Sequence, residues 1–229
     1  MKTALDSASV VPTRTAGVPT LRRLPLYLRV LRKMQEQGET YASGTVVAKA
    51  LQLDPIVVRK DMAMTGVTGR PRLGFPVDEL VTAIEAFLGW TNMTDAFLCG
   101  VGSLGRALLG YDGFEQHGLS IIAAFDIDPA KVNTTERGVP IYPLQKLPAM
   151  IKRMNVQLGI LTVPAEAAQT TAETMVGAGI RGIWNFTPVK LTLPEHIVIQ
   201  RVDLASSLAV LSHRLYMQPP QDGRRLSDD

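Results

Sequence analysis

The sequence predicts an α/β protein in two parts, a small helical domain at the N-terminus followed by a parallel, doubly wound sheet. Apolar residues recur at helical spacing from Leu24 to Leu88, whereas short apolar strands alternate with helices from Ala96 onward. Charge divides the chain similarly, because residues 1–90 carry 12 Lys and Arg against 8 Asp and Glu, and residues 91–229 carry 12 against 13. A basic part beside a near-neutral part favours a polyanionic partner for the first, although exposed helix faces are often basic without one.

Composition excludes several classes of protein. A chain of 229 residues with 46% apolar residues can bury the cores of two modest domains. No apolar run approaches the ~18 residues of a transmembrane helix, and the first residues lack the apolar segment of a secretory signal. The single cysteine, Cys99, excludes an internal disulfide and a multi-cysteine zinc site, and we expect it to be a small core residue. We therefore expect a cytoplasmic protein with no metal site and no membrane partner.

Three short helices are predicted in the N-terminal part. The first covers the apolar residues at 24–34 and stops at Gly38, and the second begins near Ser43, which can cap it. The third is predicted at 55–64, because Asp54 stands at an N-cap position and a proline follows at the first helical position, where no N–H is needed. The spacing therefore predicts a compact three-helix unit.

These helices, followed by a glycine-rich loop at 66–74, are typical of a winged helix that contains a helix-turn-helix. In such a domain the third helix lies in the DNA major groove. We expect Arg59 and Lys60 to project toward base edges or phosphates, while Ile56 and Val57 pack inward. An ordinary solvated helix face is the alternative for the two cations.

The loop that would form the wing carries two more candidate DNA contacts. Arg70 and Arg72 stand among glycines and a proline, and either could enter a minor groove. A fourth amphipathic helix at 77–88 is expected to link the two domains. The sequence thus predicts a DNA-binding surface made of the third helix and the wing.

The second part is predicted to be a Rossmann-type sheet that opens with a glycine motif. The motif G-x-G-x-x-G lies between a strand at 96–99 and a helix, where a dinucleotide pyrophosphate is bound in such folds. Its six residues are Gly100, Val101, Gly102, Ser103, Leu104 and Gly105. Further strands are expected at 119–125, 158–163, 180–186 and 197–202, with helices at 165–176 and 204–215.

An acidic residue completes the dinucleotide motif. Asp126 lies 21 residues beyond Gly105, at the end of the second strand, where it can accept hydrogen bonds from the adenosine ribose. A carboxylate there repels a 2′-phosphate, so NAD(H) is favoured over NADP(H). A sheet that binds another adenine nucleotide, or none, stays open as an alternative.

The sequence shows little of what a dehydrogenase needs, namely a catalytic acid or base and a domain that binds substrate. The three histidines, His117, His196 and His213, stand in no evident catalytic context, and no substrate domain follows the last strand. We therefore expect no catalytic residues and no enzyme activity. A small NAD-dependent dehydrogenase, and a nucleotide-binding regulator that acts through a protein partner, are the alternatives.

Six stretches spread over residues 18–215 are specific in combination. They are Arg23-Leu24-Pro25-Leu26-Tyr27-Leu28-Arg29, Val58-Arg59-Lys60-Asp61, Gly100 to Gly105 with Tyr111, Leu161-Thr162-Val163-Pro164-Ala165 with Ala167-Ala168-Gln169, Asn185-Phe186-Thr187-Pro188 and Val202-Asp203-Leu204. Together they resemble the Rex family of redox-sensing transcriptional repressors.

The resemblance implies a homodimer that binds a palindromic operator in double-stranded DNA. NADH would draw the two Rossmann domains together and release the DNA, and NAD+ would compete, so that transcription follows the NADH/NAD+ ratio. It implies that the last helix is exchanged between subunits and that Arg29, Tyr111 and Asp203 form a coupling network. It further implies that the cofactor site includes Thr162, Val163, Pro164, Asn185 and Phe186.

The chain departs from the family pattern around the wing. The residues at 62–66 lack the aromatic that is common in the family, and those at 69–75 carry extra charge and a proline. These changes bear on the operator sequence and affinity. The expected division is a flexible arm at 1–19, a winged helix at 20–89, a Rossmann domain at 90–203, a dimerisation helix at 204–216 and a flexible tail at 217–229.

Overall fold

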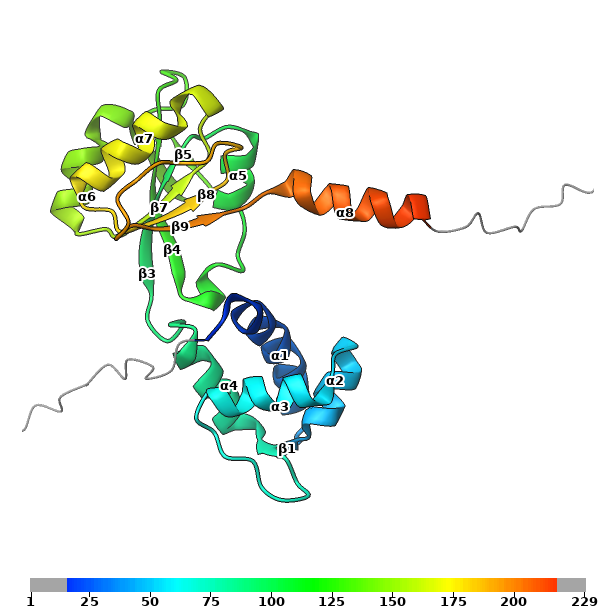
Figure 1. Ribbon diagram of the computed structural model, residues 1–229. Helices are drawn as coiled ribbons and strands as arrows, with labels where there is room; N and C mark the ends of the chain where they lie inside the picture. Colours follow the sequence, from blue (N-terminus) through cyan, green and yellow to red (C-terminus); the bar gives the residue numbers. More distant parts are fainter. Residues whose placement is uncertain (1–15, 218–229) are drawn as a thin grey trace, which may run out of the picture. The chain divides into compact units, whose positions relative to one another are not determined.

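The computed structural model describes residues 16–217, so most of the predicted arm and nearly all of the predicted tail lie outside the described residues. The chain separates into two compact units, Met1–Asn92 and Met93–Asp229. Figure 1 shows the helical character of the first unit and the central sheet of the second.

The first unit is a winged helix. Its elements are α1 (Val18–Glu36), β1 (Tyr41–Ala42), α2 (Gly44–Leu51), α3 (Pro55–Met64), β2 (Phe75–Pro76) and α4 (Val77–Phe87). The two short strands pair antiparallel and form the base of the wing. Apolar residues from all four helices make one core, which includes Leu24, Leu31, Val47, Val58 and Leu80.

Local capping explains where the helices begin. The Ser43 hydroxyl accepts the N–H of Thr45 at 3.2 Å, and the Asp54 carboxylate accepts the N–H of Ile56 at 2.6 Å, which confirms both predicted caps. The first helix begins earlier than predicted, at Val18, so the arm does not extend to residue 19. The reason is Pro19 in the first turn, where its fixed φ angle favours a helix and its missing N–H costs nothing.

The second unit is built on a seven-stranded sheet with the strand order β5-β6-β4-β3-β7-β8-β9. Five of the six pairings are parallel, and only β5 runs antiparallel, at one edge. The strands are β3 (Thr94–Cys99), β4 (Leu119–Asp126), β5 (Thr135–Glu136), β6 (Val139–Pro143), β7 (Leu158–Leu161), β8 (Gly182–Asn185) and β9 (Val198–Arg201). The helices are α5 (Ser103–Leu109), η1 (Glu115–His117), η2 (Leu144–Lys146), α6 (Leu147–Met154), α7 (Ala165–Ala178) and α8 (Leu204–Met217).

Alternating side chains of the strands enter two cores, one on each face of the sheet. Phe97 and Cys99 join residues of α6 and α7, whereas Ala96 and Leu98 pack with apolar residues of α5. Cys99 is fully buried, as predicted, and burial raises the pKa of its thiol. The predicted Rossmann architecture is therefore confirmed, with α6 and the β5–β6 hairpin as elements that the sequence did not indicate.

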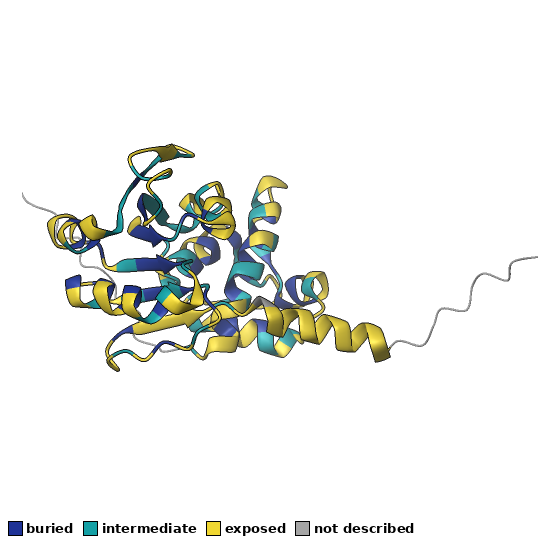
Figure 2. Ribbon diagram, turned by 90° about the horizontal axis from the view of Figure 1, so that it is seen from above, coloured by how far each residue is buried: buried dark blue, intermediate teal, exposed yellow. Residues whose placement is uncertain are grey.

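The last helix, α8, leaves the sheet without burying its side chains. Each α8 side chain that the structure describes is exposed, and Figure 2 shows the helix as a continuous exposed ribbon. Leu208, Leu211 and Leu215 are 62%, 54% and 60% exposed. Among the described residues, no helix is both long and apolar enough to span a membrane.

Candidate functional site

Parallel strands bring the predicted site residues to one edge of the sheet. Gly100 directly follows β3 and Thr162 directly follows β7, while Asp126 ends β4 and Asn185 ends β8. From β3 the chain crosses first to β4 on one side and later returns to β7 on the other, so the strand order reverses between β3 and β7. Open α/β sheets bind nucleotides in the crevice beyond the strand ends at such a point.

The three glycines of the loop after β3 have different surroundings. Gly100 has φ +97°, and a Cβ on it would lie 2.7 Å from the backbone of Thr162 and Val163. A Cβ on Gly105 would collide with the carbonyl oxygen of Gly100. At Gly102, apart from its chain neighbours, no atom of residues 16–217 lies within 4 Å of a Cβ position. The first and third glycines therefore serve a tight turn and close packing, while the second leaves open space for a ligand to approach the backbone.

Asp126 lies against this loop, not free in solvent. Its carboxylate accepts the N–H of Val101 at 2.7 Å and the N–H of Asp128 at 2.9 Å. Burial raises the pKa of the carboxyl, but these bonds and the ammonium of Lys131 outweigh it, so the pKa of Asp126 lies below its usual value. The carboxylate is thus held ionised, and its Oδ1 has a single partner within the described part of the chain, so it can accept a further hydroxyl.

Lys131 is a site residue that sequence reasoning missed. Its ammonium lies 3.3 Å from the Asp126 carboxylate and 3.5 Å from that of Asp128. The sequence signal for this contact is the turn at Asp128-Pro129, which brings Lys131 back toward Asp126. Asp128 stabilises the turn by accepting the N–H of Ala130 at 3.0 Å.

Other predicted cofactor residues line the ends of β7 and β8. The Thr162 hydroxyl lies 2.7 Å from the carbonyl oxygen of Gly100 and ties the glycine loop to β7. Val163 is partly buried and Pro164 is exposed at the N-cap of α7. Ser103 and Leu104 are exposed in the first turn of α5. The structure therefore brings these residues to the same edge as Asp126.

Asn185 is committed to the loop that follows β8. Its amide donates to the carbonyl oxygen of Val189 at 2.9 Å and accepts the hydroxyl of Thr187 at 2.8 Å, and the side chain is buried. Phe186 packs on Trp184, with ring centroids 4.9 Å apart. Asn185 therefore shapes the loop, and its direct contact with a cofactor stays a prediction.

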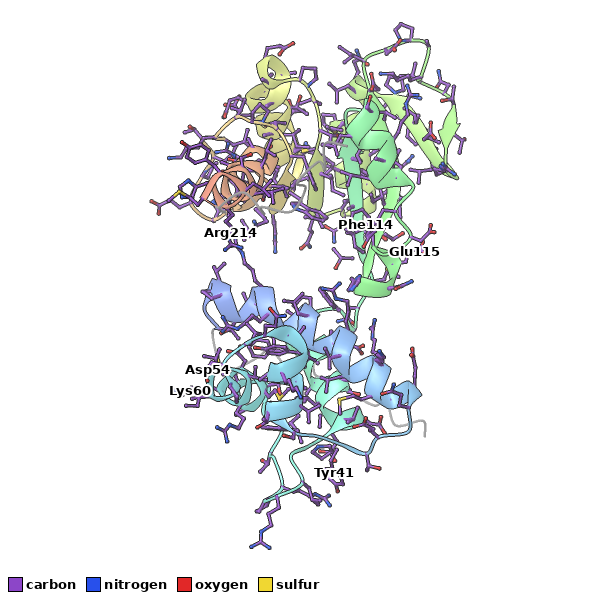
Figure 3. The ribbon with its side chains drawn as sticks, turned by 90° about the vertical axis from the view of Figure 1, so that its right-hand side faces the viewer. Tyr41, Asp54, Lys60, Phe114, Glu115 and Arg214 are labelled. Carbon is purple, nitrogen blue, oxygen red and sulfur yellow. The ribbon has the colours of Figure 1, made fainter. Side chains whose placement is uncertain are left out.

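The third helix of the winged helix presents its cations to solvent. Arg59 and Lys60 are both exposed on α3, and Figure 3 shows Lys60 and the cap residue Asp54 on this helix. The prediction that Ile56 packs inward is wrong, because its side chain is 55% exposed. The core positions on α3 are Val58 and Met62, one turn apart, which turns Ile56 toward the face of the cations.

The wing holds its two arginines differently. The Arg70 guanidinium carbon lies 5.3 Å from the ring centroid of Tyr41, a cation–π contact that orients it at the wing's base. Arg72 is exposed and has φ +66°, within a loop closed by paired backbone bonds between Arg70 and Gly74. Four exposed cations on α3 and the wing thus form a candidate DNA interface.

The residues of the proposed coupling network, Arg29, Tyr111 and Asp203, belong to both units. Arg29 is exposed on α1, and Tyr111 is exposed after α5 with its ring 4.8 Å from that of Phe114. Asp203 caps α8 by accepting the N–H of Ser206 at 3.2 Å. The network itself stays a prediction. Within the described part of the chain, no group of His, Cys, Asp and Glu is arranged to hold a metal ion.

A winged helix in the same chain as a dinucleotide-type Rossmann sheet defines a ligand-responsive DNA-binding regulator. The comparisons with known proteins name the family. A family model described as "CoA binding domain" matches residues 91–189, and one described as "Putative DNA-binding protein N-terminus" matches residues 17–63.

Individual relatives match over nearly the whole chain. The redox-sensing transcriptional repressor Rex of Treponema denticola is 46% identical over 198 residues, which are 86% of this chain and 94% of that protein. The solved structure of RSP with beta-NAD+ and operator DNA is 30% identical, has a TM-score of 0.83, and covers 89% of this chain and 94% of its own. RSP with beta-NADH gives a TM-score of 0.79 at the same identity, over 89% of this chain and 95% of its own. The chain belongs to the Rex family of redox-sensing transcriptional repressors.

Proposed function

We propose that this chain is a repressor that binds operator DNA through its winged helix and is released from it by NADH. The observation that carries the proposal is the site at the end of β3 and β4, where the open face of Gly102 adjoins the ionised carboxylate of Asp126. The matching structures of RSP hold beta-NAD+ with operator DNA in one case and beta-NADH in another. Names of the curated relatives are those of repressors, in agreement with the expectation that the chain is not an enzyme.

Chemistry at Asp126 favours NAD(H) over the ligand that the "CoA binding domain" description suggests. Coenzyme A and NADP(H) both carry a phosphate on the adenosine ribose, which a buried, ionised carboxylate repels. The ribose of NAD(H) offers free hydroxyls that can donate to that carboxylate. Lys131 neutralises part of its charge but leaves an acceptor position on Asp126.

The backbone of the glycine loop supports pyrophosphate binding. The bare Gly102 allows a phosphate to approach the N–H groups at the first turn of α5, where the amide dipoles favour an anion. Since Thr162 and Asp126 already hold the loop from both sides, this half of the site is arranged before the ligand arrives.

The exposed apolar surface of α8 and β9 bears on the assembly of the protein. We infer a homodimer in which α8 is exchanged, since Leu208, Leu211 and Leu215 leave a row of exposed leucines on a helix that no described part of its own chain buries. The exposed Val198 and Ile199 of β9 extend this apolar surface. A DNA-binding repressor of this kind acts in the cytoplasm, where operator DNA and the nucleotide pool meet.

A dimer also provides the two half-site readers that a palindrome requires. For NADH to release DNA, it must bind the released conformation more tightly than the DNA-bound one, and the ratio of the two affinities limits the response. NAD+ then acts as a competitor that occupies the site without that preference, so the repressor follows the NADH/NAD+ ratio.

The proposal is tested by selecting duplexes from a randomised palindromic library with the purified protein. The selected duplex is then titrated in a mobility-shift assay with NADH and, separately, with NAD+. We expect NADH to release the duplex and NAD+ to oppose that release. Affinity for DNA that NADH does not change would contradict the sensing role, and hydride transfer to added small carbonyl compounds would favour a dehydrogenase.

A further inference from the structure

A polar cluster inside the winged helix joins α1 to α3 and takes part neither in the candidate DNA surface nor in the cofactor site. Asp61 of α3 is 3% exposed, and three side chains of α1 surround its carboxylate. The Thr20 hydroxyl donates to Oδ1 at 2.9 Å, and the Tyr27 hydroxyl donates to Oδ2 at 2.7 Å. Arg23 binds both oxygens, through Nε at 2.6 Å and Nη2 at 3.0 Å.

The spacing on α1 makes these contacts possible. Thr20, Arg23 and Tyr27 stand at positions i, i+3 and i+7, so one face of α1 presents three donors to one carboxylate. Burial alone raises the pKa of Asp61, but the hydrogen bonds from Arg23, Tyr27 and Thr20 outweigh it, so the pKa of Asp61 lies below its usual value. The group is therefore an ionised, fully partnered carboxylate inside the domain.

Apolar packing and polar bonds connect the same two helices. Leu24 and Leu28 of α1 share the core of the winged helix with Val58 and Met62 of α3. The bonds of Asp61 add a directional polar joint between α1 and α3. Hydrogen bonds are directional, and a bidentate arginine fixes the angle between two groups as well as their distance. A buried ion pair is weak evidence for net stability, and in some proteins such a pair specifies a defined geometry instead.

The position of Asp61 gives the joint a functional consequence. It directly follows Arg59 and Lys60, the exposed cations of α3, and lies on the opposite, buried side of the same helical turn. A rotation of α3 about its axis would move both cations relative to the base edges, where hydrogen-bond readout depends on their placement.

We propose that Asp61, held by Arg23 and Tyr27, is a positioning residue that sets the orientation of α3 for operator recognition. The inference rests on the proposed function. Affinity for DNA of any sequence depends on the exposed charge, whereas preference for the operator depends on the orientation of α3. The proposal therefore predicts that changes at Asp61 affect the preference and not the non-specific affinity.

The test uses the full-length chain, a duplex selected from a randomised palindromic library by the unmodified protein, and a scrambled duplex of equal length. The variants are D61N, which keeps the size of the side chain but removes its charge, Y27F, which removes one hydrogen bond, and the pair R23K and R23Q. Affinity for each duplex is measured at fixed salt, together with the NADH affinity and the thermal unfolding of each variant.

We expect D61N to lower the ratio of selected to scrambled affinity about tenfold, which is the typical effect of one mismatched base pair. R23K should keep more of the ratio than R23Q, because it retains a cation beside Asp61, and Y27F should show a smaller loss. Affinity for the scrambled duplex and for NADH should stay close to that of the unmodified chain. Should D61N fail to fold, Y27F and R23K decide the question, since each leaves most of the cluster in place.

The matched control is R32Q. Arg32 also lies on α1 and makes a close ion pair, 2.8 Å to Glu85, but its partner belongs to α4. The positioning role is overturned if the cluster variants keep the original ratio, or if R32Q lowers it equally, because either result makes the cluster an ordinary contribution to stability. If the unmodified chain selects no duplex, the proposed function fails and this inference with it.

Discussion

Replacing Gly102 by Ala should separate folding from ligand binding in the Rossmann unit. The backbone at Gly102 has φ −81° and ψ −166°, an extended conformation that alanine adopts freely, and apart from the chain neighbours no described atom lies within 4 Å of the new Cβ. Gly→Ala at such a position stabilises the fold by about 0.4–1 kcal/mol, because it reduces the freedom of the unfolded chain. Gly102 is also the N-cap of α5, where alanine is less favourable than glycine by a similar amount, so the two effects offset each other. The variant should therefore melt close to the temperature of the unmodified protein.

The same methyl group should weaken NADH binding. It would occupy the space through which the pyrophosphate approaches the backbone, and one lost hydrogen bond to a charged group costs about 1.5–3 kcal/mol. Because each ~1.4 kcal/mol is a factor of ten, the dissociation constant should rise by about tenfold to a hundredfold. Titration followed by NADH fluorescence measures this, beside a thermal melt of the same sample.

Two other glycines serve as matched controls. Gly177 on α7 also has no described atom outside its own helix backbone within 4 Å of a Cβ position, so G177A should stabilise the fold and leave NADH affinity unchanged. G105A should lower both stability and affinity, because its Cβ would collide with the carbonyl oxygen of Gly100. Affinity of G102A for NADH equal to that of the unmodified chain would refute the proposed place of the pyrophosphate.

Three further predictions concern the other surfaces. Replacing Arg59 and Lys60 together by Ala should lower DNA affinity and reduce the slope of log affinity against log salt by up to about 2, with NADH affinity unchanged, as binding curves at several salt concentrations would show; a parallel fall in NADH affinity would point to misfolding. Replacing Leu208 and Leu211 by Ser should convert a dimer to monomers in sedimentation velocity, since it removes the apolar row of α8; an unchanged sedimentation coefficient would place the dimer contact elsewhere. Because the folded pKa of Asp61 is lowered, its stabilisation is present above the unfolded value near pH 4 and is lost as pH falls below it, so acid melts of the N-terminal unit should depend on pH less in D61N than in the unmodified chain.

Features fixed by neighbouring residues could be predicted from the sequence. Asp54 and Pro55 mark the start of α3 through a cap and a preset φ angle, and the structure begins α3 at Pro55. The glycine turn and the place of Asp126 beside it could likewise be predicted, because their spacing is that of a strand–turn–helix unit, while the ribose contact of Asp126 stays a prediction. These signals depend on a few consecutive residues and on one fixed spacing.

Features fixed by distant residues could not be predicted. The apolar side chain of Ile56 predicts a core position, yet the face of α3 that turns inward depends on how α1 and α2 pack against this helix. The donors of Asp61 lie 34 to 41 residues away on α1, and no local pattern pairs them with it. The short helix α6 and the β5–β6 hairpin were missed because elements of this length carry too few periods to detect.

The rigid attachment of Asp126 to the glycine loop has a consequence for how a redox sensor of this kind discriminates. NADH and NAD+ share the same adenosine and pyrophosphate, so on the proposed function a surface formed by Val101, Gly102 and Asp126 would bind both forms equally, whatever their oxidation state. Because both forms use this surface, NADH and NAD+ would compete for the same site. On the proposed function, all discrimination must then arise at the nicotinamide end, toward the ends of β7 and β8. Substitutions near Asp126 should therefore change the sensitivity to total nucleotide and leave the NADH/NAD+ ratio at half-response in place.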